Sequence, residues 1–219
     1  MNGLPIDNIC ILFVMHAKEE KLNTLSHAFG ILFGLIGFVV LLQNSRQLTS
    51  YATFSIIVYS VTFVLLFTAS TLYHHVKVPN LKNKLRILDH ISIYFLIAGT
   101  YTPVALIMLE KGNGWLLFYA VWGIAFAGTV MKLFYTGKYE FISVLLYLIM
   151  GWLIVLDFGN LLSQTTFFGL LTLFLGGAFY TLGIVFYAFE KVPYNHFIWH
   201  LFVLAGAISH WFFIFFEVV

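Results

Sequence analysis

The chain has 219 residues, of which 61% are hydrophobic and only 9% are Asp, Glu, Lys or Arg. A soluble domain has about 25% charged residues, so this composition excludes an ordinary globular protein and predicts a chain that lies in a bilayer. The net charge of +2 is too small to suggest a nucleic acid as partner. A single cysteine, Cys10, excludes an intrachain disulfide and a cysteine-rich metal site, so any metal must be held by nitrogen and oxygen atoms.

Residues 1–21 precede the first predicted span and contain an apolar patch from Ile9 to Met15. We do not interpret this patch as a signal peptide, because no basic residue precedes it and no clear cleavage motif follows it. We expect residues 1–21 to form an N-terminal cytoplasmic or interfacial segment with a short helix. Residues 22–219 are predicted to form one transmembrane domain.

Seven segments are long and apolar enough to cross a membrane, which takes about 20 residues of helix. The joints between them are too short to hold another domain. The predicted fold is therefore all-α, a bundle of seven transmembrane helices, in which the fifth span is the shortest. The predicted spans are 22–43, 52–75, 88–109, 115–135, 141–158, 166–189 and 196–217.

The distribution of Lys and Arg over the joints predicts the orientation, because cytoplasmic loops are enriched in these residues. If the N-terminus is inside, nine basic residues lie on the cytoplasmic side and only Arg46 and Lys111 lie outside. We therefore predict a multi-pass protein of the cell membrane with a cytoplasmic N-terminus and an external C-terminus. The nine are Lys18, Lys21, Lys77, Lys82, Lys84, Arg86, Lys132, Lys138 and Lys191.

Two histidines, His196 and His200, stand four residues apart at the start of the seventh span. Positions i and i+4 lie on one face of a helix, and zinc sites use this H-x3-H spacing. The two residues could instead be interfacial histidines that flank a span. We favour metal binding, because histidine inside lipid is rare without a partner.

His74 lies at the predicted cytoplasmic end of the second span, at the same depth as the His196–His200 pair. A lone histidine at a helix end is more often an interface residue, but the matching depth favours a third metal ligand. His75 points about 100° away around the helix and is expected to face the headgroups. His27 lies less than two turns into the first span, on the same side.

Asp89 opens the predicted third span and has three interpretations. It could cap the helix, since aspartate is favoured at helix N-termini, or it could pair with Arg86. It could instead hold a metal-bound water or act as a general base. Ser70, one turn before His74, could orient that site or bond to its own helix backbone.

Three further residues receive structural interpretations. Pro103 is expected to kink the third helix, which would open space in the bundle or shape its packing. His210 lies about 21 Å deeper than His196, too far to share a metal, and is expected to make a buried hydrogen bond. Asp157 ends the fifth span on the outer side and is expected to be solvated.

Four segments of the chain carry a family resemblance. They are Glu19-Glu20 with Asn23-Thr24-Leu25-Ser26-His27, Ser70-Thr71-Leu72-Tyr73-His74, Leu88-Asp89-His90 with Ala98-Gly99-Thr100-Tyr101-Thr102-Pro103, and His196 to Gly206. In this order they resemble bacterial hemolysin III, the prokaryotic branch of the progestin and adipoQ receptor (PAQR) family. The resemblance covers nearly the whole chain from about residue 18.

The resemblance implies a Zn²⁺ ion bound by His74, His196 and His200, with Asp89 beside a zinc-bound water and Ser70 in support. The family is similar to alkaline ceramidases, which implies membrane lipids as substrates and hydrolysis of a lipid amide. The name hemolysin implies cytolysis, and bacterial members are linked to membrane-fluidity homeostasis.

Three functions remain open at this point. The first is a zinc-dependent hydrolase of a lipid amide or ester, with Asp89 and Ser70 as catalytic residues, because three histidines and a water match an open zinc site. The second is a zinc-stabilised sensor or receptor-like protein, in which the metal only ties helices together. The third is a cytolytic protein that perturbs the membrane; an intrinsic pore is disfavoured, because the middle and outer parts of the spans have few ionisable groups.

Overall fold

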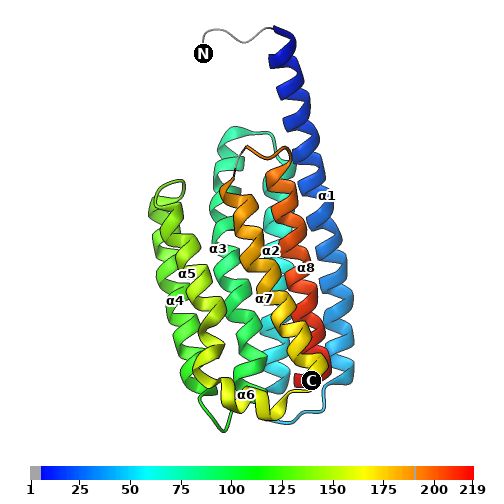
Figure 1. Ribbon diagram of the computed structural model, residues 1–219, viewed down its shortest axis with the longest axis vertical. Coiled ribbons are helices and arrows are strands. Elements are labelled where there is room, and N and C mark those ends of the chain that lie inside the picture. The colour runs from blue at the N-terminus through cyan, green and yellow to red at the C-terminus, as the bar shows by residue number, and fades with distance from the viewer. Residues whose placement is uncertain (1–5, 190) are drawn as a thin grey trace.

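The computed structural model describes the backbone of residues 6–189 and 191–219 and the side chains from residue 15 onward, except that of Glu190. In these residues all regular structure is helical, and seven helices are long and apolar enough to span a membrane. The prediction of an all-α membrane protein with seven spans is confirmed (Figure 1). The orientation of the termini stays a prediction. Residues 1–5 of the predicted N-terminal segment lie outside the described residues.

The helices follow the predicted spans, and three short segments depart from α-helical geometry. Two of these are π-helical turns, η1 and η3, and one is a 3₁₀ turn, η2. The elements are α1 (Ile6–Asn44), α2 (Ala52–His75), α3 (Pro79–Pro103), η1 (Val104–Met108), α4 (Gly114–Tyr135), α5 (Glu140–Trp152), η2 (Leu153–Asp157), α6 (Phe158–Gln164), α7 (Phe167–Ala188), α8 (Asn195–Phe213) and η3 (Ile214–Val218).

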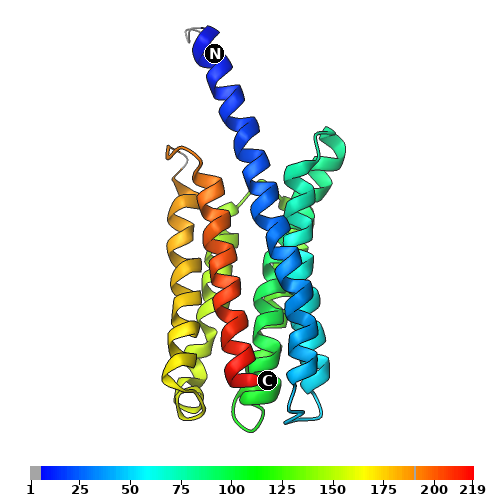
Figure 2. The same cartoon turned by 90° about the vertical axis from the view of Figure 1, so that its right-hand side faces the viewer.

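Helix α1 is longer than the predicted first span. It runs without a break from Ile6, so the segment before residue 22 does not contain a separate short helix. Its first turns project beyond the other helices (Figures 1 and 2). Whether residues 1–21 form a unit distinct from residues 22–219 stays a prediction.

Helix α3 begins at Pro79, nine residues before the predicted start of the third span. Val78 is extended and Pro79 occupies the first helical position, where its fixed φ is favourable and its missing N–H is not needed. Asp89 therefore lies nearly three turns inside the helix, and its interpretation as an N-terminal cap is wrong. At the other end of α3, the predicted interruption at Pro103 is confirmed, because the π-helical turn η1 follows directly.

The fifth crossing is longer than predicted, because α5, η2 and α6 together run from Glu140 to Gln164. Asp157 lies in this crossing with only 5% of its surface exposed, so the expectation of a solvated side chain is wrong. Its carboxylate accepts hydrogen bonds from the backbone and side-chain nitrogens of Asn113, at 3.1 and 3.0 Å, and from Asn160 Nδ2 at 2.7 Å. These amides satisfy the charge in place of water.

Helix α1 packs against both α2 and α8, which carry the candidate metal ligands. Close approach to α2 depends on small residues, because the rings of Phe67 and Phe63 lie over Gly30 and Gly34. A Cβ atom added to Gly34 would lie 2.6 Å from Phe63 Cδ1, a distance that no real side chain tolerates. Helix α3 packs on the other side of α2, and α7 packs on α8. The packing therefore brings α1, α2, α3 and α8 together around the candidate site.

Candidate metal centre

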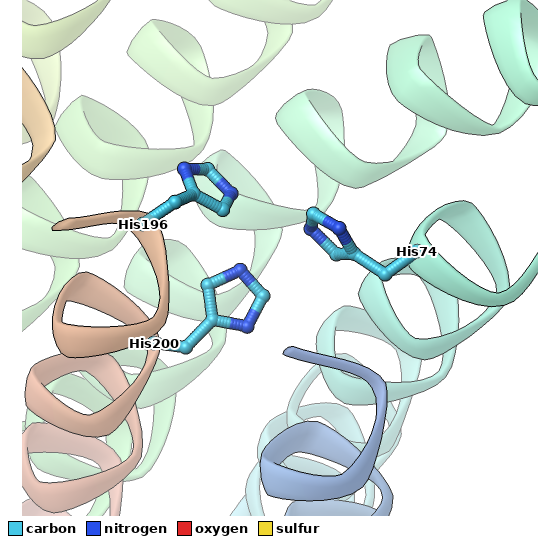
Figure 3. Close-up of side chains that lie close together, drawn as sticks. All are labelled: His74, His196 and His200. Atoms are coloured by element: carbon cyan, nitrogen blue, oxygen red, sulfur yellow. The ribbon is translucent and has the colours of Figure 1, made fainter. Parts of the chain in front are cut away.

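Three histidines from two helices face one another at the end of the bundle where α1 projects (Figure 3). His74 comes from the last turn of α2, and His196 and His200 come from the first two turns of α8. One ring nitrogen from each lies within 4.8 Å of the others. The predicted convergence of these three residues is confirmed, and the group could hold a metal ion.

The local backbone explains why these histidines lie at one depth. Helix α2 ends at His75, because Val76 adopts an extended conformation. Helix α8 begins after Tyr194, which adopts a left-handed conformation at φ 57°. His196 is thus the second helical residue, and His200 lies one turn further into the bundle. His75, the neighbour of His74, is exposed and points out of the group.

The hydrogen-bonding state of the rings fits a cation. His74 Nε2 and His200 Nδ1 are buried, and neither atom has a hydrogen-bond partner among the described residues. An unpartnered buried polar atom costs about 1–3 kcal/mol, which a metal–nitrogen bond would offset. Neutral imidazole nitrogens are ligands for Zn²⁺ and other transition metals, so the donor set fits zinc without establishing the ion's identity.

The separation of the nitrogens gives a second test of fit. Two nitrogens bound to tetrahedral zinc lie roughly 3.4 Å apart, as follows from a zinc–nitrogen distance of about 2.0–2.1 Å. The limit of 4.8 Å in this structure is wider, so the rings have to rotate inward to bind one ion. Three protein ligands leave a fourth position for water or substrate, the arrangement of catalytic zinc sites.

A fourth histidine, His27 of α1, stacks on the ring of His200. The two ring centroids are 3.8 Å apart and the planes are inclined by 23°. Both ring nitrogens of His27 are buried without a hydrogen-bond partner in the described part of the chain. The prediction placed His27 on this side of the bundle, and the structure adds that it supports the ring of a candidate ligand.

Asp89 and Ser70 reach the same site from α3 and α2. Both line a cavity of about 120 Å³ that His27, His196 and His200 also line. The alternative pairing of Asp89 with Arg86 is not found, and Arg86 Nη2 instead lies 4.0 Å from Glu140 Oε1. Asp89 is therefore placed where a carboxylate could act on a water or a substrate beside the histidines.

The cavity extends away from the histidines toward the middle of the bundle. A second cavity of about 300 Å³ adjoins it and shares Gly151, Trp152, Gly177 and His210 as lining residues. The lining of the second cavity is almost entirely apolar. His210 Nε2 lies 3.2 Å from the Leu173 carbonyl oxygen, so the predicted hydrogen bond of this histidine is confirmed.

Two groups of charged residues near the site escaped the analysis of the sequence. Glu20 of α1 has Oε2 at 3.4 Å from His74 Nδ1 and at 2.6 Å from Lys82 Nζ. Lys132 is buried, with Nζ 2.6 Å from Glu140 Oε2, and His90 Nδ1 lies 3.7 Å from Glu140 Oε1. Two signals were available in the sequence. Lys132 lies inside an apolar span, where a buried lysine needs a partner, and Glu20 belongs to a segment that carries the family resemblance.

The comparisons with known proteins identify the family of the chain. Residues 15–211 match the family described as haemolysin-III related. Hemolysin-3 of Bacillus cereus is 39% identical over 92% of this chain and 93% of its own length, and the hemolysin-3 homolog of Bacillus subtilis is 37% identical over 92% and 95%. The monocyte to macrophage differentiation factor of Homo sapiens is 31% identical over 89% of this chain and 82% of its length. No solved structure gives a significant match. With its seven apolar helices, the chain is a multi-pass membrane protein that belongs to the haemolysin-III-related family.

Proposed function

We propose that the protein is a zinc-dependent hydrolase that cleaves an amide or ester bond of a membrane lipid. The observation that carries this proposal is that the three histidines face one another and that two of them, His196 and His200, line one cavity together with Asp89 and Ser70. A site that served only to join helices would need neither an adjacent carboxylate nor space beside it. The proposal rests on the chemistry of these groups together with the family resemblance.

The reaction would divide among the residues as follows. Zinc, when bound by His74, His196 and His200, supplies Lewis acidity that polarises a carbonyl and makes water easier to deprotonate. The carboxylate of Asp89 takes a proton from the attacking water while the water oxygen bonds to the carbonyl carbon. The carbon–nitrogen or carbon–oxygen bond then breaks, and Asp89 returns the proton to the leaving amine or alcohol. Ser70, which lines the same cavity, would orient Asp89 or the substrate by a hydrogen bond.

The shape of the two cavities supports a lipid as substrate. The polar groups gather at the histidine end, and the adjoining cavity is lined mainly by aromatic and aliphatic side chains such as Phe158, Phe174 and Phe213. An acyl chain fits such a lining, because it would contact apolar side chains and bury no unpaired polar group of its own. In this arrangement the amide or ester group lies beside the metal while the acyl chain occupies the second cavity.

The test is turnover by the purified protein in defined bilayers that contain ceramides, other lipid amides or phospholipid esters. Zinc content is measured in the same preparation, before and after treatment with a chelator. We expect release of a fatty acid that is lost on chelation and restored by zinc. Absence of turnover from zinc-loaded protein on all these lipids would refute the hydrolase.

A zinc-stabilised sensor is the second candidate, and one observation favours it. The three histidines come from α2 and α8, so a bound ion would link two helices that are far apart in the sequence. Removal of the ion by a chelator would then lower the thermal stability, and the protein would show no lipid turnover before or after chelation. Cytolysis, which the names of the bacillus relatives suggest, predicts leakage of defined vesicles by the purified protein, and the same preparations can be tested for it.

A further inference from the structure

Two adjacent carboxylates on α1, Glu19 and Glu20, contact the two helices that carry the histidines. Glu20 lies beside His74 of α2. Glu19 contacts the first turn of α8, where the backbone nitrogen of His196 donates a hydrogen bond to it. We propose that these two carboxylates are positioning residues: Glu20 keeps the proton of His74 on Nδ1, so that Nε2 can bind the metal, and Glu19 caps the helix that presents the other two histidines. This inference rests on the metal site of the proposed function.

The contacts of His74 support the role of Glu20. Its Nδ1 lies 3.4 Å from Glu20 Oε2, whereas Nε2 has no hydrogen-bond partner in the described residues. Glu20 also pairs with Lys82 Nζ at 2.6 Å, as expected of an anionic carboxylate, which is only an acceptor. An acceptor at Nδ1 requires a proton there, and the remaining lone pair is then on Nε2, on the side of His196 and His200. Metal-binding histidines commonly have such a carboxylate partner on the second nitrogen.

Asn23 also approaches this nitrogen, but its contact does not select between the two tautomers. Asn23 Nδ2 lies 3.5 Å from His74 Nδ1, while Asn23 Oδ1 is buried without a hydrogen-bond partner among the described residues. Because the two ends of an amide exchange by a half-turn, Asn23 can present its oxygen to Nδ1 and its nitrogen to the other side. The amide of Asn23 can bond to His74 in either tautomer. The carboxylate of Glu20 can bond only to the tautomer that has its proton on Nδ1.

The contacts of Glu19 are those of a helix cap supplied by another helix. Tyr194 is the capping residue of α8, but its side chain accepts no hydrogen bond from the first turn. Glu19 Oε1 instead accepts from the backbone N–H groups of His196 and Phe197, at 3.2 and 3.4 Å. These are the second and third residues of α8, the positions that a capping side chain satisfies. A negative charge there also interacts favourably with the helix dipole.

The decisive comparison separates the bond to His74 from the ion pair to Lys82. Glu20→Gln removes the fixed acceptor, whereas Lys82→Met removes only the ion pair and leaves the carboxylate in place. The zinc affinity of each full-length variant is measured by competition with a chelator, and the tautomer of His74 is read from the ¹⁵N shifts of its two ring nitrogens in metal-free protein. We expect Glu20→Gln to weaken zinc binding by about 10–100-fold and to lose the Nδ1–H tautomer, and Lys82→Met to change neither.

Glu19→Ala is compared with the loss of a carboxylate at the start of another helix, at the far end of the bundle. Glu217 accepts hydrogen bonds from the backbone nitrogen and the hydroxyl of Thr166, the residue whose side chain caps α7 by accepting from Gly169 N. Both Glu19→Ala and Glu217→Ala should lower the melting temperature, but only Glu19→Ala should also weaken zinc binding. Equal zinc affinities in these two variants would refute the role of Glu19.

Equal effects of Glu20→Gln and Lys82→Met would assign Glu20 a purely structural ion pair and overturn its positioning role. An unchanged Nδ1–H tautomer in Glu20→Gln would overturn it as well. Failure of the wild-type protein to bind zinc would instead refute the metal centre of the proposed function. In that case the tautomer measurement still decides whether Glu20 orients His74.

Discussion

Replacement of His200 by alanine gives the most direct test of the metal centre. Its ring is 2% exposed, and Nδ1 has no hydrogen-bond partner within the described structure, so bound zinc would satisfy this atom. Zinc at 100 times its dissociation constant stabilises the folded state by about 2.7 kcal/mol. For a chain of this length each kcal/mol raises the melting temperature by about 2–4 °C, so zinc should raise it by roughly 5–11 °C in the wild-type protein.

The substitution also removes the contact between the rings of His200 and His27, whose centroids are 3.8 Å apart, and this loss destabilises the protein with or without metal. The measured quantity is therefore the rise caused by zinc within each variant, which cancels the common packing loss. We expect His200→Ala to lose most of the rise. His75→Ala should keep it, because the side chain of His75 is exposed and points away from the site.

The assay is thermal unfolding of the purified protein in detergent, with and without added zinc, together with elemental analysis of bound metal. A wild-type rise in His200→Ala, accompanied by one zinc ion per chain, would show that this residue is not a ligand. It would also refute the argument that unpartnered ring nitrogens mark the site.

Three further predictions test the chemistry, the orientation and the packing. Asp89→Asn should retain zinc and the fold but lose about 10²–10⁴-fold in lipid turnover, the usual contribution of a positioned acid or base; equal turnover would remove Asp89 from the mechanism. Reporter fusions should place the joint at Lys77 in the cytoplasm and the C-terminus outside, and an external Lys77 would contradict the charge argument. Gly34→Ala should destabilise the protein by about 1–3 kcal/mol, because the added Cβ atom would lie 2.6 Å from Phe63 Cδ1. Gly123→Ala is the matched control, since a Cβ atom there meets no atom of the chain within 4 Å, and a similar loss of stability in both variants would refute the packing argument.

The amino-acid sequence was sufficient to predict the number of spans and the common depth of the three histidines. A helix that crosses lipid makes all its backbone hydrogen bonds within one segment of the chain. Each span can therefore be recognised from that segment alone, as a run of apolar residues. Because the rise per residue is constant, the distance of a histidine from the end of its run gives its depth. His74, His196 and His200 could therefore be placed in one layer before their helices were known to be neighbours.

The limits of local information appear at Asp89 and Asp157. The charged residues between positions 77 and 86 were interpreted as a loop, but Pro79 starts α3 and places Asp89 deep within a helix. Asp157 was interpreted as solvated, because the sequence does not show that Asn113, more than forty residues earlier, packs over it and donates two hydrogen bonds. In both cases the environment of the carboxylate is set by a residue elsewhere in the chain, and the residues next to the carboxylate in the sequence do not predict it.

Only the tertiary structure decided which helices surround the histidines and which groups support them. Depth along a helix is a property of one segment, but the direction in which a side chain faces depends on how the helices pack. Close packing of Phe63 and Phe67 over the glycines of α1 brings that helix beside α2, and α8 packs on it as well. This arrangement places Glu19, Glu20 and His27 against the candidate ligands and leaves the cavity beside Asp89. The physical reason is that these contacts join residues from about 30 to nearly 180 positions apart, so the periodicity of a single span cannot predict them.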